Sequence, residues 1–176
     1  MIDVDNILDK LHPELKEYVG IPQIIRPNQN IPADMLTYPR MAFNFIVRSS
    51  PGSRISTIAI REVIPSTNES FQNDIEYSYV SLPTSTISIQ AFGKNINSYL
   101  RKASEWFQIH ELGGWFFEKY KGVIVDTTDI QDQKTFLETG YEDRAGFDVI
   151  IRFEDIIKVR VDTIEEVVIN GKSYSI

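Results

Sequence analysis

Apolar residues recur every three or four positions over the first twenty residues, which is the period of a helix with one buried stripe. The stripe consists of Val4, Ile7, Leu8, Leu11, Leu15 and Tyr18. Asp3 or Asp5 can cap this helix, and Gly20 can end it. Pro13 lacks a backbone N–H, so we expect either a kink or a second short helix with Pro13 in its first turn. Residues 1–20 are therefore predicted to form an N-terminal helical segment.

Between residues 37 and 92 the apolar period changes to two, which is typical of strands with one buried face. A short strand is expected earlier, at 23–26, in a segment that contains four prolines. Four alternating runs follow, at 41–47, 58–60, 75–79 and 86–92. The Pro-Gly turn at 51–52 predicts an antiparallel hairpin of the first two runs, and the polar stretch 65–74 predicts a surface connection. Residues 37–92 are thus expected to form a meander.

Helical spacing returns in residues 95–120, where Asn95 can cap a helix. The buried stripe of this helix is Ile96, Tyr99, Leu100, Ala103, Trp106 and Phe107. Gly113 and Gly114 interrupt the helical pattern that follows, which predicts a bend or a break. Two helical pieces are therefore expected between residues 95 and 120.

The last part of the chain, 122–169, is predicted as strands. A short apolar strand at 123–125 is followed by an acidic stretch, 126–143, which we interpret as a loop with room for one turn of helix. Alternation is strong over 147–153 and continues through 157–161, as one irregular long strand or two consecutive strands. Asn-Gly at 170–171 predicts a terminal hairpin over 167–176, because this dipeptide suits a type I′ turn.

These elements indicate an α+β fold, a mostly antiparallel β-sheet packed against two or three helices. With 176 residues the chain is long enough for one core and short for two, so a single domain over 1–176 is expected. Hydrophobic residues make up 42% of the chain and charged residues 24%, which provides enough apolar surface to offset the entropy lost on folding.

The charge of the chain narrows the range of partners. The formal net charge is -7, and the sequence contains no cluster of Lys and Arg, which argues against neutralisation of nucleic-acid phosphates. The chain has no cysteine, so disulfides and thiolate metal sites are excluded. The acidic, amphipathic first ten residues are expected to be neither a signal peptide nor a transit peptide. No apolar run approaches about 18 residues, so no membrane partner is expected.

Residues suited to catalysis are few. The two histidines are His12, next to Pro13, and His110, which is followed by Glu111 but lacks the second histidine of a zinc-protease helix. No G-x-S-x-G segment exposes a serine nucleophile, although a triad scattered along the chain stays open. We therefore predict no catalytic residue and favour a non-enzymatic role.

Two further groups of residues favour structural interpretations. Asp126, Asp129 and Asp132 recur every third residue, whereas a calcium loop needs acceptors at alternate positions followed by glycine, so we expect a solvated acidic loop. An aromatic group without basic neighbours indicates a core or a subunit interface rather than base stacking. Its members are Trp106, Phe107, Trp115, Phe116 and Phe117. No metal, cofactor-binding residue or cofactor is predicted.

Several segments resemble the phage neck terminator family, a group of tail terminator or head-tail joining proteins. These segments are SIQAFG at 88–93, EWF at 105–107, GVIVDTTDI at 122–130, FLE at 136–138, YEDRAGFDV at 141–149 and IEEV at 164–167. Their order and spacing are also similar, over residues 41–169 as a whole and most clearly over 88–149. The resemblance implies a tail-terminator-like fold and supplies no catalytic residues.

The resemblance also implies a role and partners. The chain would be a structural virion protein of a tailed bacteriophage neck, forming a homo-oligomeric ring, expected as a hexamer, assembled in the host cytoplasm. Its partners would be connector or neck proteins and tail-tube proteins, with DNA passing through the lumen without sequence-specific binding. The acidic net charge agrees, because like charge keeps the duplex from sticking. The alternative is a non-enzymatic binding or assembly-chaperone module of phage or bacterial origin.

A ring needs one heterologous interface repeated around its axis, which hairpins or free sheet edges can supply through strand addition. We place the candidate interface in the predicted hairpin 43–60, the strand 75–79 and the long segment 147–161. The candidate residues are Phe43, Phe45, Arg54, Ile58, Tyr77, Tyr79, Asp148 and Arg152.

Overall fold

The structure, a computed structural model, describes residues 3–26, 31–32, 35–50, 58–67, 72–133, 135–137, 140–162, 166–169 and 172–175. Within these residues the fold is α+β with mostly antiparallel strands, as expected. The chain divides into two compact units. The larger unit comprises Ile2–Gly52 and Pro83–Phe153, and the smaller unit comprises Met1, Ser53–Leu82 and Glu154–Ile176. The single domain expected from the chain length stays a prediction.

Helix α1 spans Val4–Val19 and belongs to the larger unit. It begins because the Asp3 Oδ1 atom accepts a hydrogen bond from the Asn6 N–H at 3.0 Å, and it ends at Gly20, whose φ of 71° suits glycine. Pro13 lies inside this one helix, so a second short helix is not formed. The buried stripe is Val4, Ile7, Leu8, Leu11, Leu15 and Val19.

Loss of the Asp3 cap is expected to destabilise the larger unit modestly. Asp3→Ala should lower the free energy of unfolding by about 1 kcal/mol, because the Asn6 N–H loses its acceptor. Urea unfolding followed by circular dichroism would measure this change. Asp3→Asn is the control, since it keeps an acceptor oxygen and should retain most of the stability; equal losses in both variants would contradict the capping role.

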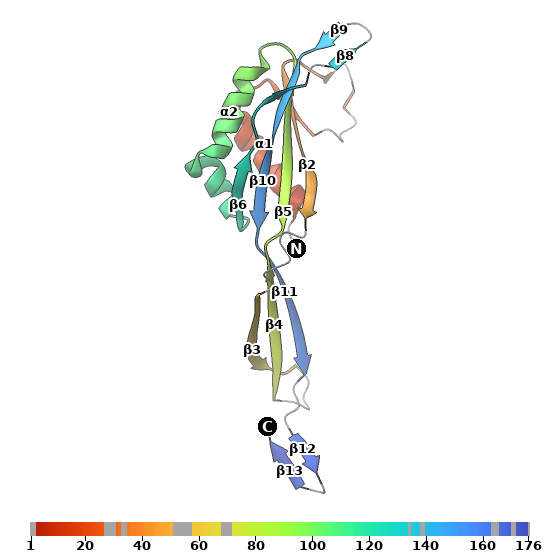
Figure 1. The fold of residues 1–176 in the computed structure, drawn as a ribbon, viewed down its shortest axis with the longest axis vertical. Helices are drawn as coiled ribbons and strands as arrows, with labels where there is room; N and C mark the ends of the chain where they lie inside the picture. The colour runs from red at the N-terminus through yellow and green to blue at the C-terminus, as the bar shows by residue number, and fades with distance from the viewer. Residues whose placement is uncertain are drawn as a thin grey trace. The chain divides into compact units, whose positions relative to one another are not determined.

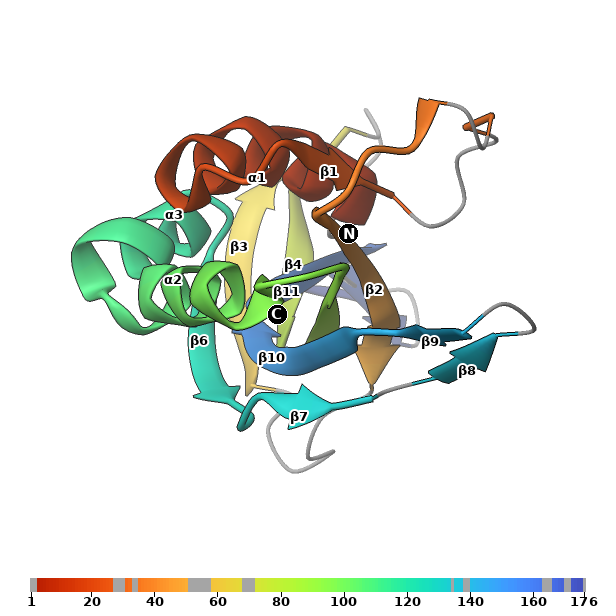
Figure 2. The same ribbon diagram turned by 90° about the horizontal axis from the view of Figure 1, so that it is seen from above.

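The larger unit contains a six-stranded sheet in the order β1-β2-β5-β10-β6, with β7 paired to β10; Figure 1 labels β2, β5, β6 and β10, and Figure 2 adds β1 and β7. Its strands are β1 (Gln23–Ile25), β2 (Arg40–Ser50), β5 (Thr84–Phe92), β6 (Gly122–Thr127), β7 (Gln131–Asp132) and β10 (Arg144–Phe153). Among the described strands of this sheet, β1 and β2 pair in parallel and the other neighbours are antiparallel. The short strand expected at 23–26 is confirmed.

The strand order differs from the expected meander. Strand β2 pairs with β5, placing Phe43 opposite Ile89 and Phe45 opposite Ile87, so the hairpin of 41–47 with 58–60 is wrong. The physical reason is that all four side chains are buried and fill one core, which this non-consecutive pairing brings together. Residues 58–60 belong to a different sheet.

The π-helix η2 (His110–Gly114) lies between helices α2 (Ile96–Gln108) and α3 (Trp115–Glu118). The two helical pieces expected here are separated at Ile109, which is extended, and not at Gly113 and Gly114, because Gly114 keeps a helical conformation that leads into α3. A Cβ atom at Gly113 would lie 2.8 Å from the Trp106 carbonyl oxygen, so the close approach of η2 to α2 requires glycine. Asn95 precedes α2, but its side chain makes no capping hydrogen bond. Helices α1 and α2 lie on the same side of the six-stranded sheet (Figure 2).

The acidic stretch 126–143 contains strands and no helical turn among its described residues. Gln131 and Asp132 of β7 pair with Gly146 and Ala145 of β10, so the sheet supplies their backbone partners. A two-stranded ladder follows, β8 (Thr135–Leu137) with β9 (Gly140–Glu142). The loop expected over 126–143, with its turn of helix, is therefore wrong for the described residues that form these strands.

The smaller unit contains a three-stranded antiparallel sheet in the order β11-β4-β3. Its strands are β3 (Ile58–Pro65), β4 (Asn73–Ser81) and β11 (Asp155–Asp162). Since β10 and β11 are separate strands in different sheets, the second interpretation of the 147–161 alternation is confirmed. Strands β12 (Glu166–Ile169) and β13 (Lys172–Ser175) confirm the terminal hairpin, whose Asn-Gly turn lies outside the described residues.

Candidate functional site

The three-stranded sheet of the smaller unit has two different faces. Side chains alternate along a strand, and directly paired residues share a face, so the register of β3, β4 and β11 sorts them. One face, here called the apolar face, consists of Val63, Ile75, Tyr77, Tyr79, Ile157, Val159 and Val161, with Arg61 at its β3 edge. The rings of Tyr77 and Tyr79 stack with centroids 6.3 Å apart.

The apolar face is exposed to an unusual extent. Val63 is 65% exposed and Ile157 56%, and none of the hydrophobic side chains described in this sheet belongs to the buried core. A contiguous exposed apolar surface typically marks a contact with another protein, because burial away from water stabilises it. The apolar face is therefore a candidate interaction surface.

The opposite face of this sheet carries charged side chains that pair with one another. The Lys158 ammonium donates to the Glu76 carboxylate at 2.6 Å, and this hydrogen bond raises the pKa of Lys158. The Arg160 Nε atom lies 3.7 Å from the Asp74 Oδ2 atom, and its Nη1 donates to the Thr67 hydroxyl at 3.3 Å. On this charged face, Lys158 and Arg160 therefore have acidic partners within the sheet. The hydrophobic side chains of the apolar face instead stay partly exposed to water.

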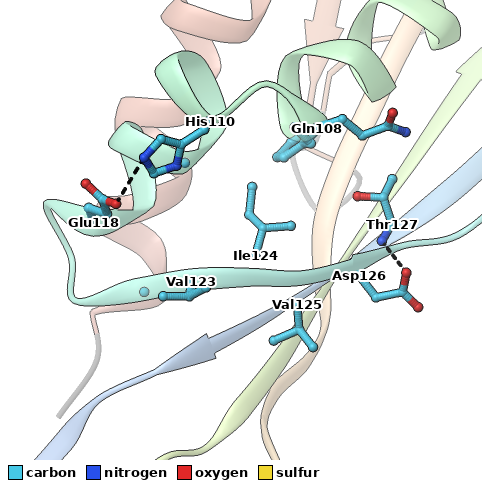
Figure 3. A pocket seen from close by; sticks show the side chains of 11 residues that line it. Gln108, His110, Glu118, Val123, Ile124, Val125, Asp126 and Thr127 are labelled. Atoms are coloured by element: carbon cyan, nitrogen blue, oxygen red, sulfur yellow. Dashed lines mark hydrogen bonds and ion pairs between the residues drawn. The ribbon is translucent and has the colours of Figure 1, made fainter.

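A cavity of about 440 Å³ lies in the larger unit between the helical segment after α2 and strand β6 (Figure 3). His110 and Glu118 come from the helical wall, with the His110 Nε2 atom 3.7 Å from the Glu118 Oε1 atom, and both side chains are more than half exposed. Strand β6 forms the other wall. Its Asp126 Oδ1 atom accepts a hydrogen bond from the Thr127 N–H at 2.8 Å.

This cavity does not assemble a recognisable catalytic group. Its lining, all within the described part of the chain, includes no serine, cysteine or lysine, and Thr127 on β6 supplies the one hydroxyl group. Val123 and Val125 on β6 are exposed. Among the described residues, no three His, Cys, Asp or Glu side chains gather closely enough to hold a metal ion. No helix in the same part of the chain is long and apolar enough to cross a membrane.

The interface residues expected from the sequence fall in different environments. Phe43 and Phe45 lie in the core, with exposed fractions of 0% and 4%, so neither is available at the surface of the described chain. Tyr77 and Tyr79 lie together on the apolar face. The interface role of these residues stays a prediction.

The other four expected interface residues are dispersed. Asp148 is half-buried in β10 and Arg152 is exposed on the same strand. Ile58 begins β3 opposite Val80, and Arg54 lies outside the described residues. Sequence reasoning missed Val63, because the alternating run was taken to end at residue 60, whereas residues 157–161 of the apolar face lie in the long segment where the interface was expected.

Most of the segments that resemble neck terminators lie in the larger unit, whereas IEEV at 164–167 belongs to the smaller unit. SIQAF lies in β5, which pairs with the β10 segment RAGFDV, and β6 pairs with the other side of β10. The EWF segment lies in α2. The model of the phage neck terminator protein family matches residues 9–175. The chain belongs to the phage neck terminator family.

A search of the curated proteins finds no match. The family match extends the resemblance seen in 41–169 over nearly the whole chain, both units included. Phage neck terminators are structural proteins of the bacteriophage neck, which places this neck terminator among virion components that associate with other neck or tail proteins.

Proposed function

We propose that this neck terminator is a subunit of a ring that surrounds the DNA channel where the phage head joins the tail. The observation that carries the proposal is the family match over residues 9–175. Six copies are the expected number. The ring would contact connector or neck proteins on one side and tail-tube proteins on the other, after assembly in the host cytoplasm.

The physical features of the chain support this role. A ring subunit must offer surface to its neighbours, and the exposed apolar face provides such surface. The net charge of -7 suits a channel through which DNA passes without binding to specific sequences. The role requires no catalytic residue or cofactor.

Assembly of the purified chain tests the proposal. Mass photometry and negative-stain microscopy should detect rings with a central channel, formed either by the chain alone or after addition of the connector and tail-tube proteins of the same phage. Mass spectrometry should find the chain in purified virions. A chain that stays monomeric and binds neither partner would contradict the proposal, whereas one that binds a partner during assembly but is absent from virions would indicate a chaperone.

A further inference from the structure

We propose that β3 of one copy pairs with β11 of the next, so that the three-stranded sheet continues from subunit to subunit around the ring. The inference rests on the proposed ring and names the contact that builds it. The partner that pairs with each open edge of this three-stranded sheet is therefore a second copy of this chain.

The first support is the open edges of the sheet. Strand β4 lies in the centre, and β3 and β11 are the outer strands, each eight residues long. No other strand of the described chain pairs with their outer edges. An exposed edge of this length presents a row of backbone N–H and C=O groups, which favours pairing with another chain unless the edge is blocked.

The second support is strand direction. Both outer strands are antiparallel to β4, so β3 and β11 run in the same direction as each other. A rotation about an axis roughly along the strands therefore places β3 of each copy beside β11 of its neighbour, in parallel, at every contact. This is a heterologous interface that can close into a ring, whereas pairing β3 with β3 would require a twofold axis and would produce dimers.

The third support is the side chains that this pairing would bring together. Within one copy, Glu62 of β3 and Arg160 of β11 both pair with Glu76 of β4. If the two copies pair without a shift along the strands, Glu62 of one copy therefore lies beside Arg160 of the next on the charged face. Val63 and Val161 both stand opposite Ile75, so they meet on the apolar face. Opposite charges and β-branched pairs at neighbouring positions both stabilise a sheet. The two edges are thus complementary on both faces.

Engineered cysteines can test this contact, because the natural chain has none. The double variant Glu62→Cys with Arg160→Cys should give, on oxidation, a ladder of covalently linked oligomers that stops at the copy number of the ring. A bond within one copy is excluded, because β4 separates the two positions by two strand spacings, roughly 10 Å, beyond the ~7 Å reach of a disulfide.

A second pair, Val63→Cys with Val161→Cys, tests the same register without removing Arg160 from Asp74. The matched control is Val63→Cys with Arg160→Cys, whose side chains lie on opposite faces of the sheet and should give no ladder. Single variants should give dimers at most.

The outcomes separate this inference from the proposed function. A ladder from either same-face pair, with none from the control, supports β3–β11 pairing. Rings that form without a ladder from either pair overturn the pairing and leave the ring standing. Dimers from Glu62→Cys alone, as abundant as the products of the double variant, indicate β3–β3 contact and also overturn it. A chain that forms no ring, alone or with its neck partners, overturns both.

Discussion

Phe117→Ala is expected to lower the free energy of unfolding of the larger unit by about 3–5 kcal/mol. Phe117 is fully buried and joins three elements, with its ring centroid 6.2 Å from Phe107 of α2, 5.0 Å from Phe116 of α3 and 6.3 Å from Phe153 of β10. Truncation removes these contacts and leaves a cavity among rigid aromatic rings that relax little. Urea unfolding followed by circular dichroism, at a concentration that keeps the chain monomeric, measures the loss.

Trp115→Ala is the matched control for this change. Trp115 lies two residues earlier in the same short helix and carries a larger ring, but it is 53% exposed and has a single described ring contact, with His110 at 6.4 Å. Its truncation should change stability by no more than about 0.5 kcal/mol. Equal losses in the two variants would mean that burial in the aromatic core does not decide the effect, contrary to the structure.

The local elements were predictable because their signals are local. The stripe of the first helix, apart from its last member Tyr18, and the alternation over 86–92 and 147–153 depend on residues a few positions apart, and the structure contains each of these elements. Strand pairing is not local. The alternation of 41–47 is the same whichever strand lies beside it, and the pairing of Phe43 with Ile89 spans a long insertion that contains β3 and β4. A rule that pairs consecutive strands therefore fails here.

The candidate interface was also not predictable from local sequence patterns alone. Phe43 and Phe45 flank Asn44 in β2 much as Tyr77 and Tyr79 flank Ser78 in β4, so both runs predict an apolar strand face. Alternation shows that a face is apolar, but it does not show what covers it. Residues distant in the sequence bury the first face in the core of the larger unit, whereas the second lies on a sheet whose described hydrophobic side chains all stay partly exposed.

Val63→Asp is expected to prevent ring assembly while leaving the fold of the subunit intact. Val63 is 65% exposed on an edge strand, so a carboxylate there remains hydrated in the monomer and should change its stability little. In the proposed contact the same carboxylate would lie against Val161 of the neighbouring copy and lose water without gaining a partner. We expect each contact to weaken about 10- to 100-fold, or ~1.4–3 kcal/mol.

Val123→Asp is the matched control, because Val123 is 63% exposed and also lies on an edge strand, β6, but in the larger unit. Mass photometry at equal concentrations should find rings for this variant and only small species for Val63→Asp, with unchanged circular dichroism in both. Since every subunit of a ring carries the same substitution, the loss repeats at each contact, and a moderate weakening is enough to abolish closure. Assembly of both variants would rule out Val63 as a contact, and failure of both would indicate that the β6 edge belongs to the interface as well.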